Sequence, residues 1–140
     1  MSQENVELLR RGYGALNAAY KSGDVGDLRP LADEWDPDMV VSTQGGVLAG
    51  GGEWQGSAGM LGMVASQMEA FQQMRLEPLE FIEVGDKVVV PIRFGGRARH
   101  TGIELEFPAV NVFTFRDGRV VRMETYDSKA EALEAAGATE

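Results

Sequence analysis

The sequence of 140 residues contains no cysteine and only one histidine. The absence of cysteine excludes disulfides, thiolate nucleophiles and cysteine-based metal sites, and it is typical of a protein in a reducing compartment. A lone histidine cannot build a typical zinc site, and His100 lies among arginines at the predicted tip between two strands, which favours solvent exposure over catalysis. We therefore expect neither a metal nor a cofactor.

Positive charge and long apolar runs are also scarce. The chain has 13 Lys and Arg against 22 Asp and Glu, a net charge of -9 at pH 7, so polyanions such as nucleic acid are repelled overall. No apolar run approaches the roughly 20 residues needed to cross a bilayer, and the first residues lack the basic patch and apolar core of a secretion signal. The sequence predicts a cytoplasmic protein without a nucleic-acid or membrane partner.

The length and composition predict a single domain that spans residues 1–140, since 44% hydrophobic and 25% charged residues are typical of a globular protein. Apolar side chains recur at three- and four-residue steps in residues 4–21, and a methionine-rich face repeats in the same way in residues 57–73. Both patterns predict amphipathic helices. Ser57 is the expected cap of the second one.

Two shorter helices and a loop complete the helical and irregular parts. A helix fits residues 25–34, and another fits residues 129–136, where Asp127 or Ser128 is the expected cap. Five glycines in residues 44–52 predict a mobile loop. These glycines match neither a dinucleotide-binding nor a P-loop pattern.

The hydrophobic period changes to two after residue 75. The pattern predicts strands at residues 76–84, 87–98, 103–116 and 119–126, after an earlier strand at residues 39–43. Asp117 and Gly118 are the strongest short-range signal for a hairpin turn between the last two. Helices followed by an antiparallel meander indicate an α+β fold and not an alternating α/β one.

Five short motifs occur in this order: YGALN at 13–17, WDPDMV at 35–40, WQG at 54–56, FTFRDGRVV at 113–121 and ETYD at 124–127. Together they resemble the SnoaL-like branch of the nuclear transport factor 2 superfamily, over nearly the whole chain. The resemblance implies a cone-shaped fold, in which a strongly curved, mainly antiparallel sheet is closed by three helices of the N-terminal half around a pocket, with a short C-terminal helix. It also implies a homodimer through the convex sheet face.

Known relatives include ketosteroid isomerases, polyketide cyclases, scytalone dehydratases and limonene epoxide hydrolases, so the fold does not select one reaction. The resemblance places the isomerase base at Thr43 and its donating tyrosine at Gly12, next to Tyr13. It places the protonated carboxyl of the isomerase at Asn111, where an amide can still donate a hydrogen bond. The missing base disfavours the isomerase mechanism.

The charged groups of the limonene-type hydrolases are missing too. Under the resemblance they fall on Ile92, Phe94 and Thr125, and the aspartate of SnoaL-type cyclases also falls near Thr125. Because side chains alternate along a strand, a slip of one residue brings Glu124 into the pocket instead. Glu124 or Asp38 as a working acid or base is therefore a hypothesis that the sequence leaves open.

The same alternation assigns the side chains of the sheet to two faces. The concave face receives Ile92, Phe94, Ala109, Asn111, Phe113, Val121, Met123 and Thr125, and the convex face receives Arg93, Val110, Val112, Thr114, Arg122 and Glu124. With the helical wall, the predicted pocket contains Tyr13, Asn17, Trp35, Thr43, Met60, Met63, Phe94, Asn111, Phe113, Met123 and Thr125. Such a pocket suits a small hydrophobic molecule with one or two hydrogen-bonding groups.

Asn111 is the best candidate for a polar anchor, and a buried amide satisfied by backbone is the alternative. Asn111, Tyr13 and Glu124 are the candidates for catalysis. Two functions stay open: a weak isomerase, lyase or cyclase, or hydrolase on a small hydrophobic substrate, or a noncatalytic dimeric domain that binds a ligand or a partner. The sequence does not decide whether the protein is an enzyme.

Overall fold

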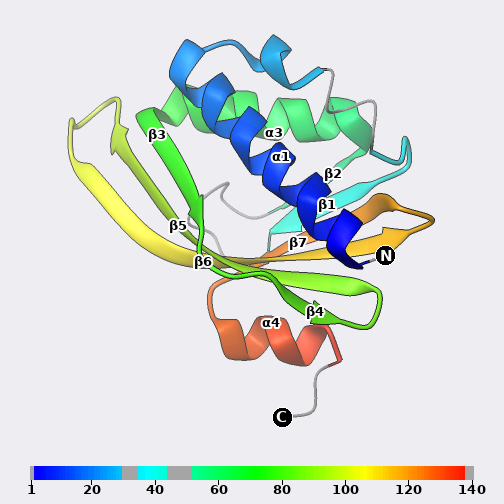
Figure 1. Ribbon diagram of the computed structural model, residues 1–140. Helices are drawn as coiled ribbons and strands as arrows, with labels where there is room; N and C mark the ends of the chain where they lie inside the picture. Colours follow the sequence, from blue (N-terminus) through cyan, green and yellow to red (C-terminus); the bar gives the residue numbers. More distant parts are fainter. Residues whose placement is uncertain (1, 30–34, 44–51, 138–140) are drawn as a thin grey trace.

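The computed structural model describes residues 2–29, 35–43 and 52–137 (Figure 1). The elements in chain order are α1 (Ser2–Ser22), the 3-10 helix η1 (Val25–Leu28), β1 (Val40–Thr43), β2 (Gly52–Gln55), α3 (Gly56–Ala70), β3 (Phe71–Pro78), β4 (Ile82–Val84), β5 (Lys87–Ala98), β6 (Glu104–Arg116), β7 (Arg119–Tyr126) and α4 (Lys129–Ala135). This order confirms the predicted α+β class.

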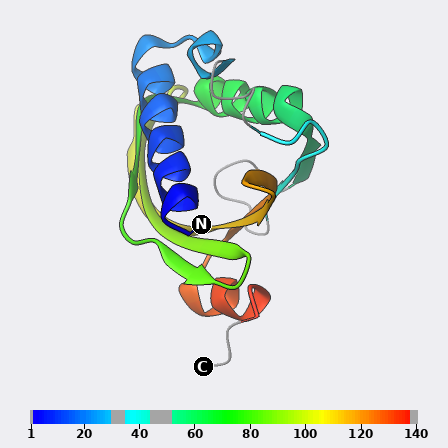
Figure 2. The same ribbon diagram turned by 45° about the vertical axis from the view of Figure 1, so that its right-hand side comes forward.

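The strands form one curved sheet in the order β2-β1-β7-β6-β5-β3, and β4 also pairs with β5. Neighbouring strands are antiparallel except β1 and β7, which run parallel. The helices α1 and α3 lie on the concave side of the sheet and α4 lies on the convex side (Figures 1 and 2). The sheet and helices therefore have the predicted cone arrangement.

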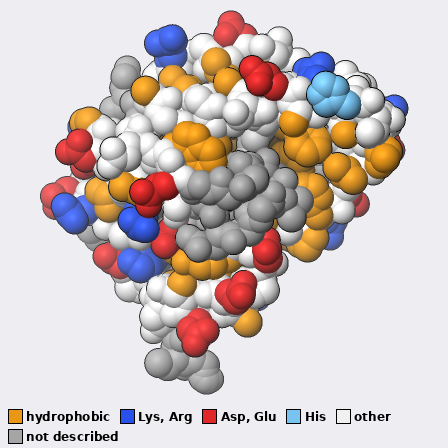
Figure 3. Space-filling model, turned by 180° about the vertical axis from the view of Figure 1, so that it is seen from behind, with side chains coloured by type: hydrophobic (Ala, Val, Ile, Leu, Met, Phe, Trp, Pro, Cys, Tyr) orange, Lys and Arg blue, Asp and Glu red, His pale blue; other side chains and the backbone are white. Residues whose placement is uncertain are grey.

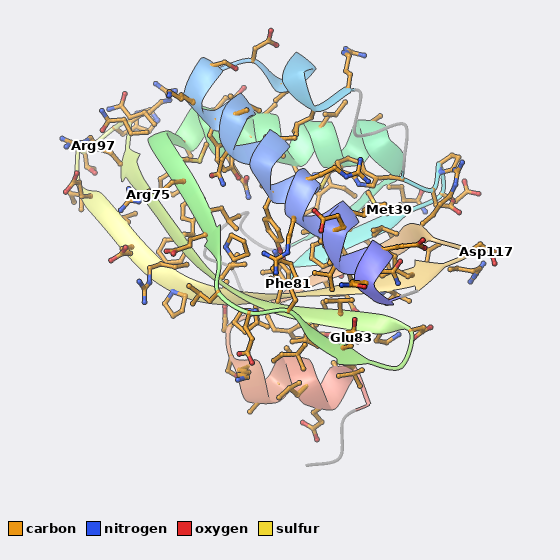
Figure 4. The ribbon with its side chains drawn as sticks, in the orientation of Figure 1. Met39, Arg75, Phe81, Glu83, Arg97 and Asp117 are labelled. Atoms are coloured by element: carbon orange, nitrogen blue, oxygen red, sulfur yellow. The ribbon has the colours of Figure 1, made fainter. Side chains whose placement is uncertain are left out.

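The meander and the last helix follow their sequence signals closely. At the β6–β7 turn, Asp117 has φ +55° and Gly118 has φ +77°, the left-handed pair of a tight hairpin turn. Asp117 lies at one end of the sheet and Arg97 at the other (Figure 4). Ser128 caps α4, because its side chain accepts a hydrogen bond of 3.1 Å from the backbone N–H of Glu131.

The predicted cap of the methionine-rich helix is wrong. α3 begins at Gly56, directly after β2, and Gln55 is its N-cap residue without a side-chain hydrogen bond. Gly56 has φ +71°, and a Cβ there would lie 2.9 Å from the carbonyl oxygen of Pro37. Because only glycine adopts this backbone without strain or collision, Gly56 and not Ser57 fixes the start of the helix.

Pairing with β5 decides the boundaries in residues 71–84. α3 ends at Ala70, earlier than predicted, because Phe71 already begins β3 and pairs with β5. Gln73 has φ +55° where the β3 register shifts, and this irregularity bends the strand. The single strand predicted at 76–84 is divided, since β3 ends at Pro78 and β4 begins afresh at Ile82.

Two further predictions concern segments near the gaps. In residues 25–34 the described part is η1, capped by the Asp24 side chain, which accepts from the N–H of Gly26; residues 30–34 lie outside the described residues. Residues 44–51 of the predicted loop also lie outside the described residues. Gly52 begins β2, an antiparallel partner of β1 that the sequence pattern missed.

A second apolar cluster lies on the convex face, under α4. It is formed by Val89, Val110 and Val112 of the sheet with Ala132 and Ala136 of the C-terminal region. Val110 and Val112 have the predicted convex position, but the chain's own helix buries them. This part of the face is therefore not open to a second copy, and dimerisation through the rest of it stays a prediction.

Part of the outer surface can be followed in the space-filling view. His100, coloured pale blue in Figure 3, is exposed in the turn between β5 and β6, as expected.

Within residues 2–29, 35–43 and 52–137, no helix is long and apolar enough to span a membrane. The same residues bring together no group of three or more His, Asp or Glu side chains that could hold a metal ion.

Candidate functional site

A cavity lies between the helices and the concave face of the sheet. The centre of a water molecule can range over about 70 Å³ of it. Since about 10–15 Å³ of such space holds one water, there is room for several waters or one small organic molecule. The described lining residues are Leu8, Leu9, Gly12, Tyr13, Leu16 and Tyr20 of α1; Met60, Met63, Val64 and Gln67 of α3; Leu76, Ile92, Asn111, Phe113, Val120, Met123 and Thr125 of the sheet; and Leu28, Trp35 and Met39 between them. None of these side chains is charged.

Three polar side chains form a directed chain of hydrogen bonds in this cavity. Thr125 Oγ1 donates to Asn111 Oδ1 at 3.0 Å, and Asn111 Nδ2 donates to the Tyr13 hydroxyl oxygen at 2.7 Å. Asn111 and Thr125 are directly opposite each other on β6 and β7. The Tyr13 O–H has no acceptor among the described residues, so this series of hydrogen bonds ends in a free donor inside an apolar cavity.

The ring of Tyr13 is held from two sides. Phe113 packs edge-to-face against it at 6.0 Å between ring centroids, and Phe81 does so at 6.4 Å. The Arg10 guanidinium lies 4.7 Å from the centroid of the Phe81 ring, which Figure 4 labels beside α1. Edge-to-face contacts fix ring orientation, so the hydroxyl is pre-positioned before any ligand arrives.

Burial raises the pKa of Tyr13 well above its usual value, while the hydrogen bond from Asn111 opposes the rise and the nearby Tyr20 adds to it. Burial also raises the pKa of Tyr20. Both phenols are therefore neutral at physiological pH, and each has a proton to donate. Neither can serve as a general base there.

A second polar pair lies farther along α1. The Tyr20 hydroxyl donates to Gln67 Oε1 on α3 at 2.9 Å, and both side chains are buried. This pair was not predicted, although the sequence contains a signal for it. Tyr20 follows Tyr13 by two helical turns on the same face, and Gln67 interrupts the apolar stripe that contains Met60 and Met63.

A comparison with models of known protein families shows to which family the chain belongs. The SnoaL-like domain matches residues 13–123, most of the chain. The chain belongs to the SnoaL-like family. No functionally curated protein matches it significantly.

Solved structures similar to this SnoaL-like protein share its architecture. The structure of TerC co-crystallized with polyporic acid is 27% identical, with a TM-score of 0.68 and coverage of 96% of this chain and 99% of TerC. A protein of unknown function with a nuclear transport factor 2-like fold, from Burkholderia pseudomallei, is 25% identical, with a TM-score of 0.71 and coverage of 96% and 98%. A putative SnoaL-like polyketide cyclase from Jannaschia sp. is 20% identical over 99% and 94%, with a TM-score of 0.70, and shows the fold alone.

Most of the residues predicted for the pocket of this SnoaL-like protein line the cavity. They are Tyr13, Trp35, Met60, Met63, Asn111, Phe113, Met123 and Thr125. Asn111 is bonded to two side chains, Tyr13 and Thr125, and not to backbone as the alternative required. The structure therefore gathers the predicted polar anchor and its two partners at one place.

Three other predicted residues do not line it. Asn17 uses its whole amide on the backbone of Leu76, since Nδ2 donates to the carbonyl oxygen and Oδ1 accepts from the N–H, both at 2.8 Å; it fastens α1 to β3. Phe94 is fully buried in the core between Phe71 and Phe107. The backbone of Thr43 pairs with β7, and its side chain lies outside the described residues.

The proposed carboxylate acids or bases are not in the described cavity. Glu124 is on the convex side, where its Oε2 accepts from the Tyr126 hydroxyl at 3.1 Å and lies 3.4 Å from Arg122 Nε. Asp38 is exposed before β1. The strand slip that would bring Glu124 inward does not occur, so the hypothesis of a working carboxylate at either position is wrong.

One assignment along β7 is wrong because the strand is irregular. Val120 lines the cavity in place of the predicted Val121. The pairing shifts between Thr114 and Phe115: Thr114 is opposite Arg122, but Phe115 is opposite Val120. The extra residue on β7 reverses the alternation beyond it, and the sequence pattern contains no sign of this.

The buried phenols predict a loss of stability at alkaline pH. Folding raises the pKa of Tyr13 and Tyr20 above 10.0. The contribution of these neutral phenols to the free energy of unfolding is therefore fully present below pH 10, and it is lost as the pH rises toward the folded-state pKa values. Each phenol is expected to remove at most about 1.4 kcal/mol per pH unit in that window. Urea unfolding between pH 9 and 11 measures this slope. The double variant Tyr13→Phe, Tyr20→Phe should flatten it, and an unchanged slope contradicts the prediction.

Proposed function

We propose that this SnoaL-like protein binds a small, neutral, largely apolar molecule in the concave cavity, and that the Tyr13 hydroxyl donates a hydrogen bond to an acceptor on it, such as a carbonyl oxygen. The observation that carries the proposal is the chain from Thr125 through Asn111 to Tyr13, which ends in an unused donor. Each bond polarises the next, so the last O–H is a strengthened donor.

The chemistry of the lining supports a neutral ligand. Because none of the described lining residues is charged, an ionic group would lose its hydration there without gaining a partner. A solved relative, TerC, was co-crystallized with polyporic acid, which supports an organic small molecule as the occupant. Residence in the cytoplasm and a homodimer are part of the proposal.

A weak enzymatic activity is the second candidate, and the Tyr13 donor favours it. A hydrogen-bond donor pre-positioned in an apolar site stabilises negative charge that develops on a carbonyl oxygen. The described lining offers no carboxylate or imidazole to move a proton, so an isomerase, lyase, cyclase or hydrolase would depend on carbonyl polarisation alone. Binding without turnover is therefore the first candidate.

Tyr13→Phe tests the proposal with a matched pair of probes. The symmetric diketone 1,4-diacetylbenzene should bind more tightly than 1,4-diethylbenzene, which has nearly the same shape and no acceptor. We expect Tyr13→Phe to lower this preference about three- to ten-fold, the value of one hydrogen bond. Nuclear magnetic resonance titration of each probe measures both affinities. Tyr126→Phe is the control, because Tyr126 lies on the other side of the sheet.

An unchanged preference in Tyr13→Phe would falsify the assigned role of Tyr13. Failure of both probes to bind the wild-type protein overturns the proposed function as a whole. A preference that falls equally in Tyr126→Phe also contradicts the proposal, because that tyrosine does not line the cavity.

A further inference from the structure

Tyr20 and Gln67 leave a second donor in the cavity that the Tyr13 site does not use. Gln67 Oε1 accepts from the Tyr20 hydroxyl at 2.9 Å, which fixes which end of the amide is engaged. The Nε2 group has no hydrogen-bond partner among the described residues, and Gln67, a residue that is 6% exposed, lines the cavity. An amide donor that lines a cavity and has no protein partner is free to donate to a ligand or to an ordered water there.

The two polar groups lie at different heights of the cavity. Tyr13 and Tyr20 are seven residues apart on α1, which corresponds to roughly 10 Å along the helix axis. Figures 1 and 2 show α3, which carries Gln67, next to the C-terminal half of α1. The side chain of Leu16, between the two tyrosines on α1, is apolar and lines the cavity together with Met63. Apolar side chains therefore lie between the two polar groups.

We infer that Gln67, held by Tyr20, is a second specificity-determining contact, and that the ligand is a neutral molecule with two hydrogen-bond acceptors at opposite ends of an apolar body. One acceptor meets the Tyr13 hydroxyl and the other meets Gln67 Nε2. The inference rests on the proposed function and names its ligand class. A molecule that has an acceptor at just one end gains one of the two hydrogen bonds and not the other.

A series of three probes of matched shape tests the number of contacts: 1,4-diacetylbenzene with two acceptors, 4-ethylacetophenone with one, and 1,4-diethylbenzene with none. In the wild-type protein each added acceptor should tighten binding about three- to ten-fold. Gln67→Met, which keeps the length of the side chain and removes the amide, should remove the advantage of the diketone over the monoketone. It should leave the advantage of the monoketone over the hydrocarbon in place.

The monoketone gives a sharper test, because it can bind in either of two orientations. Its affinity should change by no more than about two-fold in Tyr13→Phe or in Gln67→Met, since the remaining donor still serves its single acceptor. The double variant should bind all three probes alike. An additive loss from the two single variants overturns the inference.

A second substitution separates lost contact from lost folding. Gln67→Leu also removes the amide donor but has a different side-chain shape, so it should likewise abolish the advantage of the diketone over the monoketone if the lost contact, and not the altered packing, is the cause. If Tyr13→Phe lowers the diketone preference while Gln67→Met and Gln67→Leu leave it unchanged, the second contact is wrong and the proposed function stands. If no probe binds the wild-type protein, both are wrong.

Discussion

Replacement of Asn111 by leucine is expected to lower the free energy of unfolding by about 2–4 kcal/mol. Asn111 is 4% exposed and is bonded to two buried hydroxyls, those of Tyr13 and Thr125. Leucine has a similar volume, so the packing is nearly kept, but both hydroxyls lose a partner. Leaving a buried polar group without a partner costs about 1–3 kcal/mol. Urea unfolding at pH 7, where the phenols are neutral, measures the difference.

The matched control is Thr125→Val, which removes one hydroxyl and one hydrogen bond and keeps the shape of the side chain. We expect it to cost about 1–2 kcal/mol, less than Asn111→Leu, because only one partner is left without a bond. A loss below about 0.5 kcal/mol in Asn111→Leu, within the range of ordinary surface changes, means that the hydrogen-bonded chain does not stabilise the fold. Asn111→Leu should also reduce the diketone preference, since it releases the Tyr13 hydroxyl from its fixed position.

Local sequence signals were enough for the meander. The period-2 pattern predicted the bounds of β5 and β7. The Asp117–Gly118 turn predicted where β6 ends and β7 begins, because a tight turn sets the register of the strands that it joins. The amphipathic pattern of α1 places Tyr13 toward the sheet. These signals act within a few residues, and the sequence shows them directly.

The missed features depend on contacts between distant residues. β2 becomes a strand by pairing with β1, and α3 ends early because Phe71 pairs with Ala98 of β5. The bulge that brings Val120 and not Val121 into the cavity is set by the pairing of β6 with β7. No local pattern reports such pairings, so tertiary context overrides the local period.

For the same reason, only part of the candidate site could be predicted from the sequence. Alternation on β6 and β7 placed Asn111 and Thr125 on the concave face, but it could not show that a helix residue 98 positions away completes their chain of hydrogen bonds. Asn17 was expected in the pocket because it is polar and lies on the right helix. Its amide instead satisfies the backbone of Leu76, a distinction that requires the position of β3 relative to α1.

Ala132→Asp is expected to detach α4 from the convex face and to lower the free energy of unfolding by about 3 kcal/mol, the lower end of the cost of an unpaired buried charge. Ala132 is fully buried against the cluster that contains Val89, Val110 and Val112. A carboxylate cannot remain there without a partner, so the helix must move away and expose the three valines. Denaturant unfolding measures the stability, and size-exclusion chromatography measures the self-association that such an exposed apolar patch promotes.

Ala130→Asp is the matched control, because Ala130 is exposed in the first turn of the same helix, where a negative charge is favourable. It should leave both the stability and the elution volume as in the wild-type protein. The comparison also bears on the dimer, since α4 occupies the very valines that the sequence assigned to a convex association surface. If Ala132→Asp changes neither quantity, α4 does not protect that face, and a second copy of the chain becomes the better candidate for covering it.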